Sequence, residues 1–155
     1  MFVLLLLKIE FFHLRIIGII DLQVYCRIYN FVASFFSSKQ PSVFREFGIV
    51  ILHAVCAASE PACVVTALET SAVNHLVAFL EAGDASFHQV AQQHGMLALR
   101  ENPELMGTSV GMLRKAAAIM LYLSRVPVCR KNFTKHQQRL LQFTMSQLVC
   151  YSLRF

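Results

Sequence analysis

The sequence lacks any uninterrupted apolar run long enough to cross a membrane. A spanning helix needs about 18 or more consecutive apolar residues, and the apolar stretch over residues 16–36 is interrupted by Asp21 and Arg27. No basic residue precedes the apolar run at residues 2–7, so the start also lacks the first region of a signal peptide. Charged residues are scarce, at 15% against about 25% in an average soluble domain, while 56% are hydrophobic. We therefore expect apolar faces that a partner protein covers.

Paired cysteine spacing is also missing, and the number of cysteines is odd, so a disulfide framework has no support. Four of the five cysteines lie in apolar runs, where a free cysteine behaves as a small hydrophobic residue. This usage is typical of a reducing compartment. The five are Cys26, Cys56, Cys63, Cys129 and Cys150.

Motifs that would carry catalysis or hold a metal are absent. The sequence has no Gly-x-Ser-x-Gly turn and no His-Glu-x-x-His pair, and its six glycines do not cluster into a phosphate-binding loop. Cys56 and Cys63 are seven residues apart and His88 and His94 are six apart, which does not match zinc ligand spacing. His53 lies in an apolar run and is expected in a core or an interface. We expect no enzyme activity, no catalytic residue, no cofactor, no metal and no small-molecule substrate.

Strand signals are scarce, since there is no Asn-Gly or Asp-Gly hairpin turn. Helix signals recur instead. Ser59 and Ser71 are expected to cap helix starts. Gly83 is expected to end a helix and Asp84 to cap the next one. Thr134 forms a capping-box pattern with the glutamine three residues later. The expected helices cover residues 22–37, 41–58, 60–69, 72–82, 84–99, 109–125 and 135–145.

Two of these expected helices, over residues 41–58 and 109–125, are apolar on every side along much of their length. In the second, residues 116–123 are expected to be buried between neighbours, Leu121 included. Helices of this kind are typical of the inner layer of a stacked helical repeat, whereas a closed bundle has mostly one-faced helices. The sequence therefore predicts an all-α fold of the α-solenoid type, with an end that needs another surface to cover it.

Negative charge is absent from the last third of the chain. Residues 105–155 contain no Asp or Glu, whereas acids outnumber bases between residues 41 and 104. Such a basic half can face solvent, bind an acidic protein surface or contact nucleic acid. The cations are widely spread with few aromatic neighbours, so nucleic-acid contact is expected to be only indirect or weak. The candidate partner-binding residues are Arg114, Lys115, Arg125, Arg130, Lys131 and Arg139.

Four segments, in this order, resemble the C-terminal domain of the ARID-bearing, Osa-type subunits of SWI/SNF chromatin remodelers. They are FREFGIVILHAVC (residues 44–56), AVNHLVAFLE (72–81), TSVGMLRKAAAIMLYLSRV (108–126) and QRLLQFTMSQL (138–148). The resemblance implies an armadillo-like helical repeat that holds other subunits of the remodeler together. It implies that the ATPase lies on another polypeptide and the DNA-binding ARID lies upstream.

The sequence is interpreted as a non-catalytic scaffold of a SWI/SNF-type complex in the nucleus, which docks other SWI/SNF subunits and supports transcription regulation without contacting a membrane. Residues 22–155 are assigned to a partial armadillo-like domain, because the family's sequence continues beyond this chain. Residues 1–21 match nothing in the family and form an unassigned hydrophobic leader. A small membrane-associated helical protein and a basic nucleic-acid-binding module are the alternatives.

Overall fold

The computed structural model describes residues 29, 32 and 42–152. All regular structure in this part of the chain is helical, which confirms the all-α prediction. The expected leader, and the expected helix over residues 22–37 apart from two positions, lie outside the described residues. The elements are α3 (Ser42–Ala58), α4 (Glu60–Leu68), α5 (Ala72–Glu101), the 3₁₀ turn η1 (Pro103–Met106), α6 (Val110–Arg125), the 3₁₀ turn η2 (Pro127–Cys129), α7 (Lys131–Thr134), α8 (Gln137–Thr144) and α9 (Gln147–Ser152).

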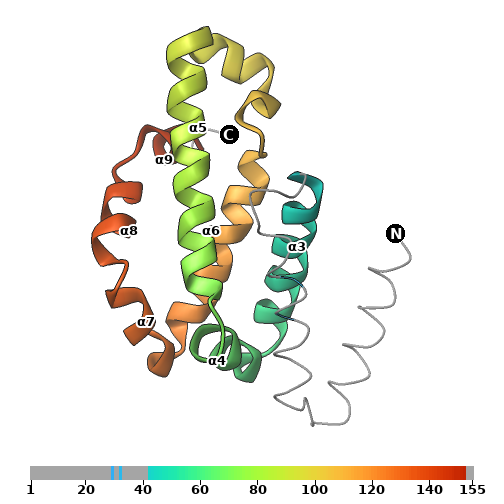
Figure 1. Ribbon diagram of the computed structural model, residues 1–155, viewed down its shortest axis with the longest axis vertical. Helices are drawn as coiled ribbons and strands as arrows, with labels where there is room; N and C mark the ends of the chain where they lie inside the picture. Colours follow the sequence, from blue (N-terminus) through green and yellow to red (C-terminus); the bar gives the residue numbers. More distant parts are fainter. Residues whose placement is uncertain (1–28, 30–31, 33–41, 153–155) are drawn as a thin grey trace.

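The three longest helices run side by side, with α6 between α3 and α5 (Figure 1). The short helix α4 joins α3 to α5 at one end, and α7, α8 and α9 follow one another along the other side of α5 (Figure 1). Each fully buried Leu, Ile or Phe contributes roughly 1.5–3 kcal/mol, and α6 supplies such residues toward both neighbours. Fully buried side chains of this core are Ile49, Leu76, Phe87, Ile119 and Leu123.

Two helix starts follow from serine caps. The Ser59 hydroxyl accepts a hydrogen bond from the backbone N–H of Ala62 at 3.4 Å, and the Ser109 hydroxyl accepts one from Met112 at 3.2 Å. Each bond satisfies an N–H that has no partner inside its helix. The predicted starts of α4 and α6 are therefore confirmed. Ser71 also precedes α5 as predicted, but its side chain makes no capping hydrogen bond.

The predicted helix stop at Gly83 is wrong, because α5 continues through it. Gly83 is buried, and a Cβ atom there would lie 2.6 Å from Cδ2 of Leu113 on α6. The glycine therefore serves the close approach of α5 and α6. Asp84, expected to cap a new helix, lies inside α5. The break comes instead at Gly95, whose φ of 80° and ψ of 165° belong to a region that glycine adopts without steric cost.

The prediction that α6 is buried on every side is also wrong. Leu121 is 51% exposed, and Ala117 one turn earlier is exposed as well. Arg114 and Arg125 lie on the same solvent-facing side, at the three- and four-residue spacing of one helix face. An apolar run shows that a helix can be buried, but it does not show how many sides have neighbours.

Thr134 does not cap the helix that follows it. It ends α7, and its hydroxyl donates to the carbonyl of Lys131 at 2.7 Å. The hydroxyl is thus used within its own turn, a local bond that competes with capping. Consequently α8 begins at Gln137, with His136 at the N-cap position.

Within the described residues, no single helix combines the length and the apolarity that a membrane crossing requires. Only α4 and α5 taken together pass on length and composition, and the two meet at an angle of 82°. Both contribute buried residues to the core, including Ala67 on α4 and Leu76 on α5.

Candidate interaction surface

An apolar groove of about 330 Å³ lies where α5, α6, α8 and α9 meet. Its volume is at the lower end of the range of about 300–1,000 Å³ that is usual for ligand pockets. Among the described residues that line it, only Arg114 and Thr144 are polar. The apolar lining includes Leu80, Leu113, Met120, Leu140, Phe143 and Leu148.

A second groove, of about 310 Å³, lies between α7 and α8. It shares Leu140 and Thr144 with the first groove, so the two adjoin across α8. Leu141, which is 58% exposed, lines the second groove together with Phe133 and Arg130. We call the two together the paired grooves. They place partly exposed apolar side chains on both sides of one short helix.

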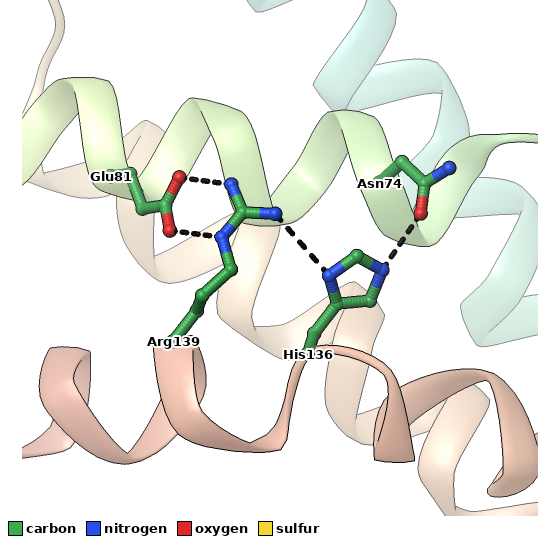
Figure 2. A network of polar contacts seen from close by, with 4 residues as sticks. All are labelled: Asn74, Glu81, His136 and Arg139. Carbon is green, nitrogen blue, oxygen red and sulfur yellow. Dashed lines mark hydrogen bonds and ion pairs between the residues drawn. The ribbon is translucent and has the colours of Figure 1, made fainter.

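A network of polar contacts attaches α8 to α5 (Figure 2). Asn74 and Glu81 are seven residues apart on α5, which is about two turns of 3.6 residues and puts both on one face. Arg139 bonds both carboxylate oxygens of Glu81 through Nε and Nη2. His136 lies between Arg139 and Asn74, with Nδ1 3.3 Å from the arginine Nη1 and Nε2 2.7 Å from the Asn74 Oδ1.

His136 has a polar partner at each ring nitrogen. A guanidinium only donates hydrogen bonds, so Nδ1 of this buried ring accepts from Arg139, and Nε2 faces the Asn74 Oδ1. The hydrogen bond from Arg139 holds the pKa of Glu81 below its usual value, and Glu81 in turn raises the pKa of Arg139. No residue of α8 is fully buried, and these bonds hold the helix on α5 together with the packing of Leu140 and Phe143 against the core.

Three of the six predicted partner-binding residues lie at the paired grooves or beside them. Arg114 is exposed and lines the first groove, and Arg130 lines the second. Arg130 also donates from Nε to the carbonyl of Ser124 at 2.9 Å, near the end of α6. Arg139 is used within the chain, in its ion pair with Glu81. Each groove thus contains one of these arginines, Arg114 in the first and Arg130 in the second.

The other three predicted residues line neither groove. The guanidinium of Arg125 lies 5.9 Å from the ring centre of Tyr122, within the range of a cation–π contact. Lys131 is exposed and Lys115 is half-buried. The basic residues therefore do not form a single cluster.

The sequence did not reveal the apolar lining, or that Asn74, Glu81 and His136 join Arg139 in holding α8. Leu140, Leu141 and Phe143 are close in sequence but belong to different sides of α8, and the opposite wall comes from α5 and α6. The seven-residue spacing of Asn74 and Glu81 was a visible signal for a shared helix face, but nothing in the sequence identified the helix that it meets.

Three cysteines lie buried and without a disulfide where α3, α4 and η2 meet. The Cys63 thiol donates to the carbonyl of Cys56 at 3.2 Å, and the Cys129 thiol to the carbonyl of Cys63 at 3.8 Å. The neighbouring Cys63 side chain and burial raise the pKa of Cys56, and burial raises that of Cys129. Both therefore remain thiols. Among the described residues, no group of three or more His, Cys, Asp or Glu side chains is placed to hold a metal.

Comparison with known proteins identifies relatives of this chain by sequence. A family model described as SWI/SNF-like complex subunit BAF250/Osa matches residues 19–113. That range holds α3, α4, α5 and the start of α6. It ends one residue before Arg114, so the six predicted partner-binding residues all follow it.

Two fruit-fly proteins named "Trithorax group protein osa" are similar to the chain. The Drosophila melanogaster protein is 41% identical over 111 residues, which are 72% of this chain and 4% of that protein. The Drosophila yakuba protein is 45% identical over 83 residues, which are 54% of this chain and 26% of that protein. The chain therefore spans only a small part of either relative. No solved structure matches it significantly.

The family model covers more than half of the chain, and the resemblance noted in residues 44–56 and 72–81 falls within the matched range. The chain belongs to the BAF250/Osa family of SWI/SNF-like complex subunits.

Proposed function

We propose that this chain is a non-catalytic scaffold segment of a SWI/SNF-type chromatin-remodeling complex, and that it docks other subunits of the complex in the nucleus. Its family consists of complex subunits, which supports an assembly role. The observation that carries the docking role is the paired grooves, whose lining is apolar and open on both sides of α8.

Exposed apolar groups at these grooves are what a docking role needs. Leu141 on α8 is 58% exposed, and Met145, the residue that follows α8, is 86% exposed. Exposed apolar patches mark sites of protein association when they are contiguous. A partner that covers Leu141 and fills the adjoining grooves removes this surface from water, at roughly 25 cal/mol for each Å² of apolar area.

We further propose that the fold is part of an armadillo-like helical repeat. The stacking of α3, α6 and α5 side by side supports this arrangement (Figure 1). In such repeats each unit contacts only its neighbours, so a part of the array leaves a face that another unit or another protein covers.

Direct nucleic-acid binding is not favoured by the placement of the cations. Binding along a phosphate backbone depends on several cations on one surface, and in the described part of the chain each groove is lined by one cation, Arg114 or Arg130. Arg125 and Arg139 contact Tyr122 and Glu81 within the chain.

Sedimentation tests the proposed function. The full chain is tagged, expressed in Drosophila cells and followed through a glycerol gradient together with the ATPase subunit of the remodeler. We expect the chain to sediment with the ATPase. Leu141→Ser is expected to shift it to light fractions, because a side chain at the docking surface is lost.

Leu121→Ser is the matched control. Leu121 has a similar exposed fraction, 51%, on another helix and lines neither groove, so this variant is expected to sediment with the ATPase as the unmodified chain does. If the unmodified chain stays in the light fractions, the proposed assembly role is wrong. If both leucine variants behave alike, the grooves are not the docking surface.

A further inference from the structure

Thr134, at the end of α7, lies among cations. Arg130 and Lys131 precede it by four and three residues, and Lys135 follows it directly. Among the Ser and Thr residues whose side chains the structure describes, Thr134 is the one with a cation at both of these preceding positions. Protein kinases distinguish their target hydroxyls partly by such patterns of flanking charge.

The fold brings Thr134 and Arg130 to one side of α7. Arg130 has helical backbone angles and directly precedes α7, so the two side chains are one turn apart on the same helix face. Both are exposed, and both line the second groove. The bond from the Arg130 Nε to the Ser124 carbonyl positions the guanidinium and uses one of its five N–H donors. A phosphoryl group on Thr134 would therefore have an oriented arginine within one helical turn.

We infer that Thr134 is a phosphorylation site for a protein kinase that selects basic residues before its target, and that the phosphate regulates docking at the second groove. The regulatory part rests on the proposed docking function. The modification itself does not, because it depends only on the hydroxyl and on the charges that precede it.

The transfer uses ATP as the phosphoryl donor. The Thr134 Oγ1 attacks the γ-phosphorus, so a bond forms between Oγ1 and phosphorus while the bond from phosphorus to the β,γ-bridging oxygen breaks. ADP leaves with the bonding electrons, and the hydroxyl proton passes to a carboxylate base of the kinase. The products are ADP and a threonine phosphate monoester, and no group is oxidised or reduced.

The weak attachment of α7 makes Thr134 accessible to a kinase. No residue of α7 is buried. Asn132 donates to the carbonyl of Ala67, and Phe133 packs partly buried against the core. The Thr134 hydroxyl itself bonds only within its own turn, to the carbonyl of Lys131. A segment with so few buried groups opens at a low free energy, so α7 can enter the cleft of a kinase while the long helices stay folded.

Phosphate at this position changes the chemistry of the second groove. Phosphothreonine carries a charge of about −1.5 to −2 at pH 7, beside the apolar side chains of Phe133, Leu140 and Leu141. A partner that places apolar groups in the groove would have to remove water from this charge, which is costly. Arg130 can bond two phosphate oxygens at once, which would hold the anion at the groove. Phosphorylation is therefore expected to weaken docking there.

Mass spectrometry of the full chain tests the modification. The chain is isolated, with phosphatase inhibitors, from the Drosophila cells in which its sedimentation is followed, and isotope-labelled peptide standards quantify the phosphate. We expect phosphate on Thr134. Lys131→Gln should lower its occupancy at least about tenfold, because a charge-assisted contact with the kinase is lost. Lys135→Gln is the matched control and should keep the phosphate, since Lys135 follows the target.

Sedimentation of charge variants tests the regulation. Thr134→Glu, which places a permanent negative charge at the groove, should shift the chain to light fractions. Thr134→Gln has nearly the same shape without the charge and should shift it less. Gln138→Glu adds the same charge to an exposed residue of α8 that lines neither groove, and this variant should sediment with the ATPase.

The contrary results separate the two parts of the inference. Absence of phosphate from Thr134, or equal occupancy in the Lys131→Gln and Lys135→Gln variants, would overturn the assigned modification site. Equal shifts of Thr134→Glu and Thr134→Gln, or of Thr134→Glu and Gln138→Glu, would overturn the regulation by charge at the groove. In either case the proposed function stands if the unmodified chain sediments with the ATPase. If that chain stays in the light fractions, the proposed function and the regulation are both wrong, and mass spectrometry still decides the modification.

Discussion

Replacing Gly83 by alanine tests the close contact between α5 and α6. In an exposed helix, Gly→Ala would stabilise the protein by up to about 1 kcal/mol, because alanine loses less backbone entropy on folding. At Gly83 the new Cβ would lie 2.6 Å from Cδ2 and 3.3 Å from Cδ1 of Leu113. Leu113 is itself buried, so its methyl groups have little room to move.

The cost of such overpacking is typically about 1–3 kcal/mol. Subtracting the gain in helix propensity leaves a net loss of roughly 0–2 kcal/mol for Gly83→Ala. Gly111→Ala is the matched control, since Gly111 is exposed in the first turn of α6 and its Cβ would meet only the Ser109 hydroxyl, at 3.6 Å. That variant should gain about 0.5 kcal/mol.

Urea denaturation of the full chain, followed by circular dichroism, measures both changes. A third variant, Leu113→Val, removes the two methyl positions that the new Cβ approaches. Leu113→Val should lower the free energy of unfolding by at least about 1 kcal/mol less in the Gly83→Ala background than in the unmodified chain, because contacting residues are coupled. If Gly83→Ala stabilises the protein as much as Gly111→Ala does, or if the two changes are additive, the close contact does not explain the glycine.

Two further predictions concern the core and the ion pair. Leu123→Ala should lower the free energy of unfolding by about 2–5 kcal/mol, because Leu123 is fully buried. Leu121→Ala should change it by less than about 1 kcal/mol. If thermal melts show similar losses of stability for both variants, the assigned buried face of α6 is wrong. The pKa of Glu81 is lowered in the folded chain from its usual 4.5, so its pairing stabilises the fold above that pH and is lost as pH falls through the lowered pKa. The difference in stability between the unmodified chain and Glu81→Gln should therefore shrink on acidification, and also in high salt because the pair is exposed; a difference that stays constant with pH would refute this assignment.

The sequence was informative wherever the signal is local. Serine capping depends on the few backbone groups that follow the serine, so the cap at Ser59 was identified from its own surroundings. Pro127 just after α6 is equally local, since proline cannot continue a helix. The family resemblance added the order of these helices and is confirmed by the family match.

Signals that depend on a distant partner were misread. Glycine ends helices often, but Gly83 is required by Leu113, thirty residues away along the chain. The apolar character of Leu121 did not reveal that one side of α6 has no neighbour. The α-solenoid arrangement and the armadillo-like repeat remain predictions for the same reason, since they concern how helices stack beyond their immediate neighbours.

The candidate site could be predicted only in part. The charge pattern of the sequence selected six candidate residues, and two of them, Arg114 and Arg130, line the paired grooves. The same criterion selected Arg139, whose charge is used to hold α8 on α5. Charge along a sequence does not separate an arginine that meets a partner from one that pairs within the chain, because Glu81 lies 58 residues away.

The attachment of α8 has a consequence for local unfolding. A helix with no fully buried side chain opens at a lower free energy than the core helices do. Its amide hydrogens should therefore exchange with solvent well before those of α6. The outer wall that α8 gives to both grooves can thus lift away while α3, α5 and α6 stay folded, and a protein bound in the grooves would slow exchange at α8 more than at those three helices.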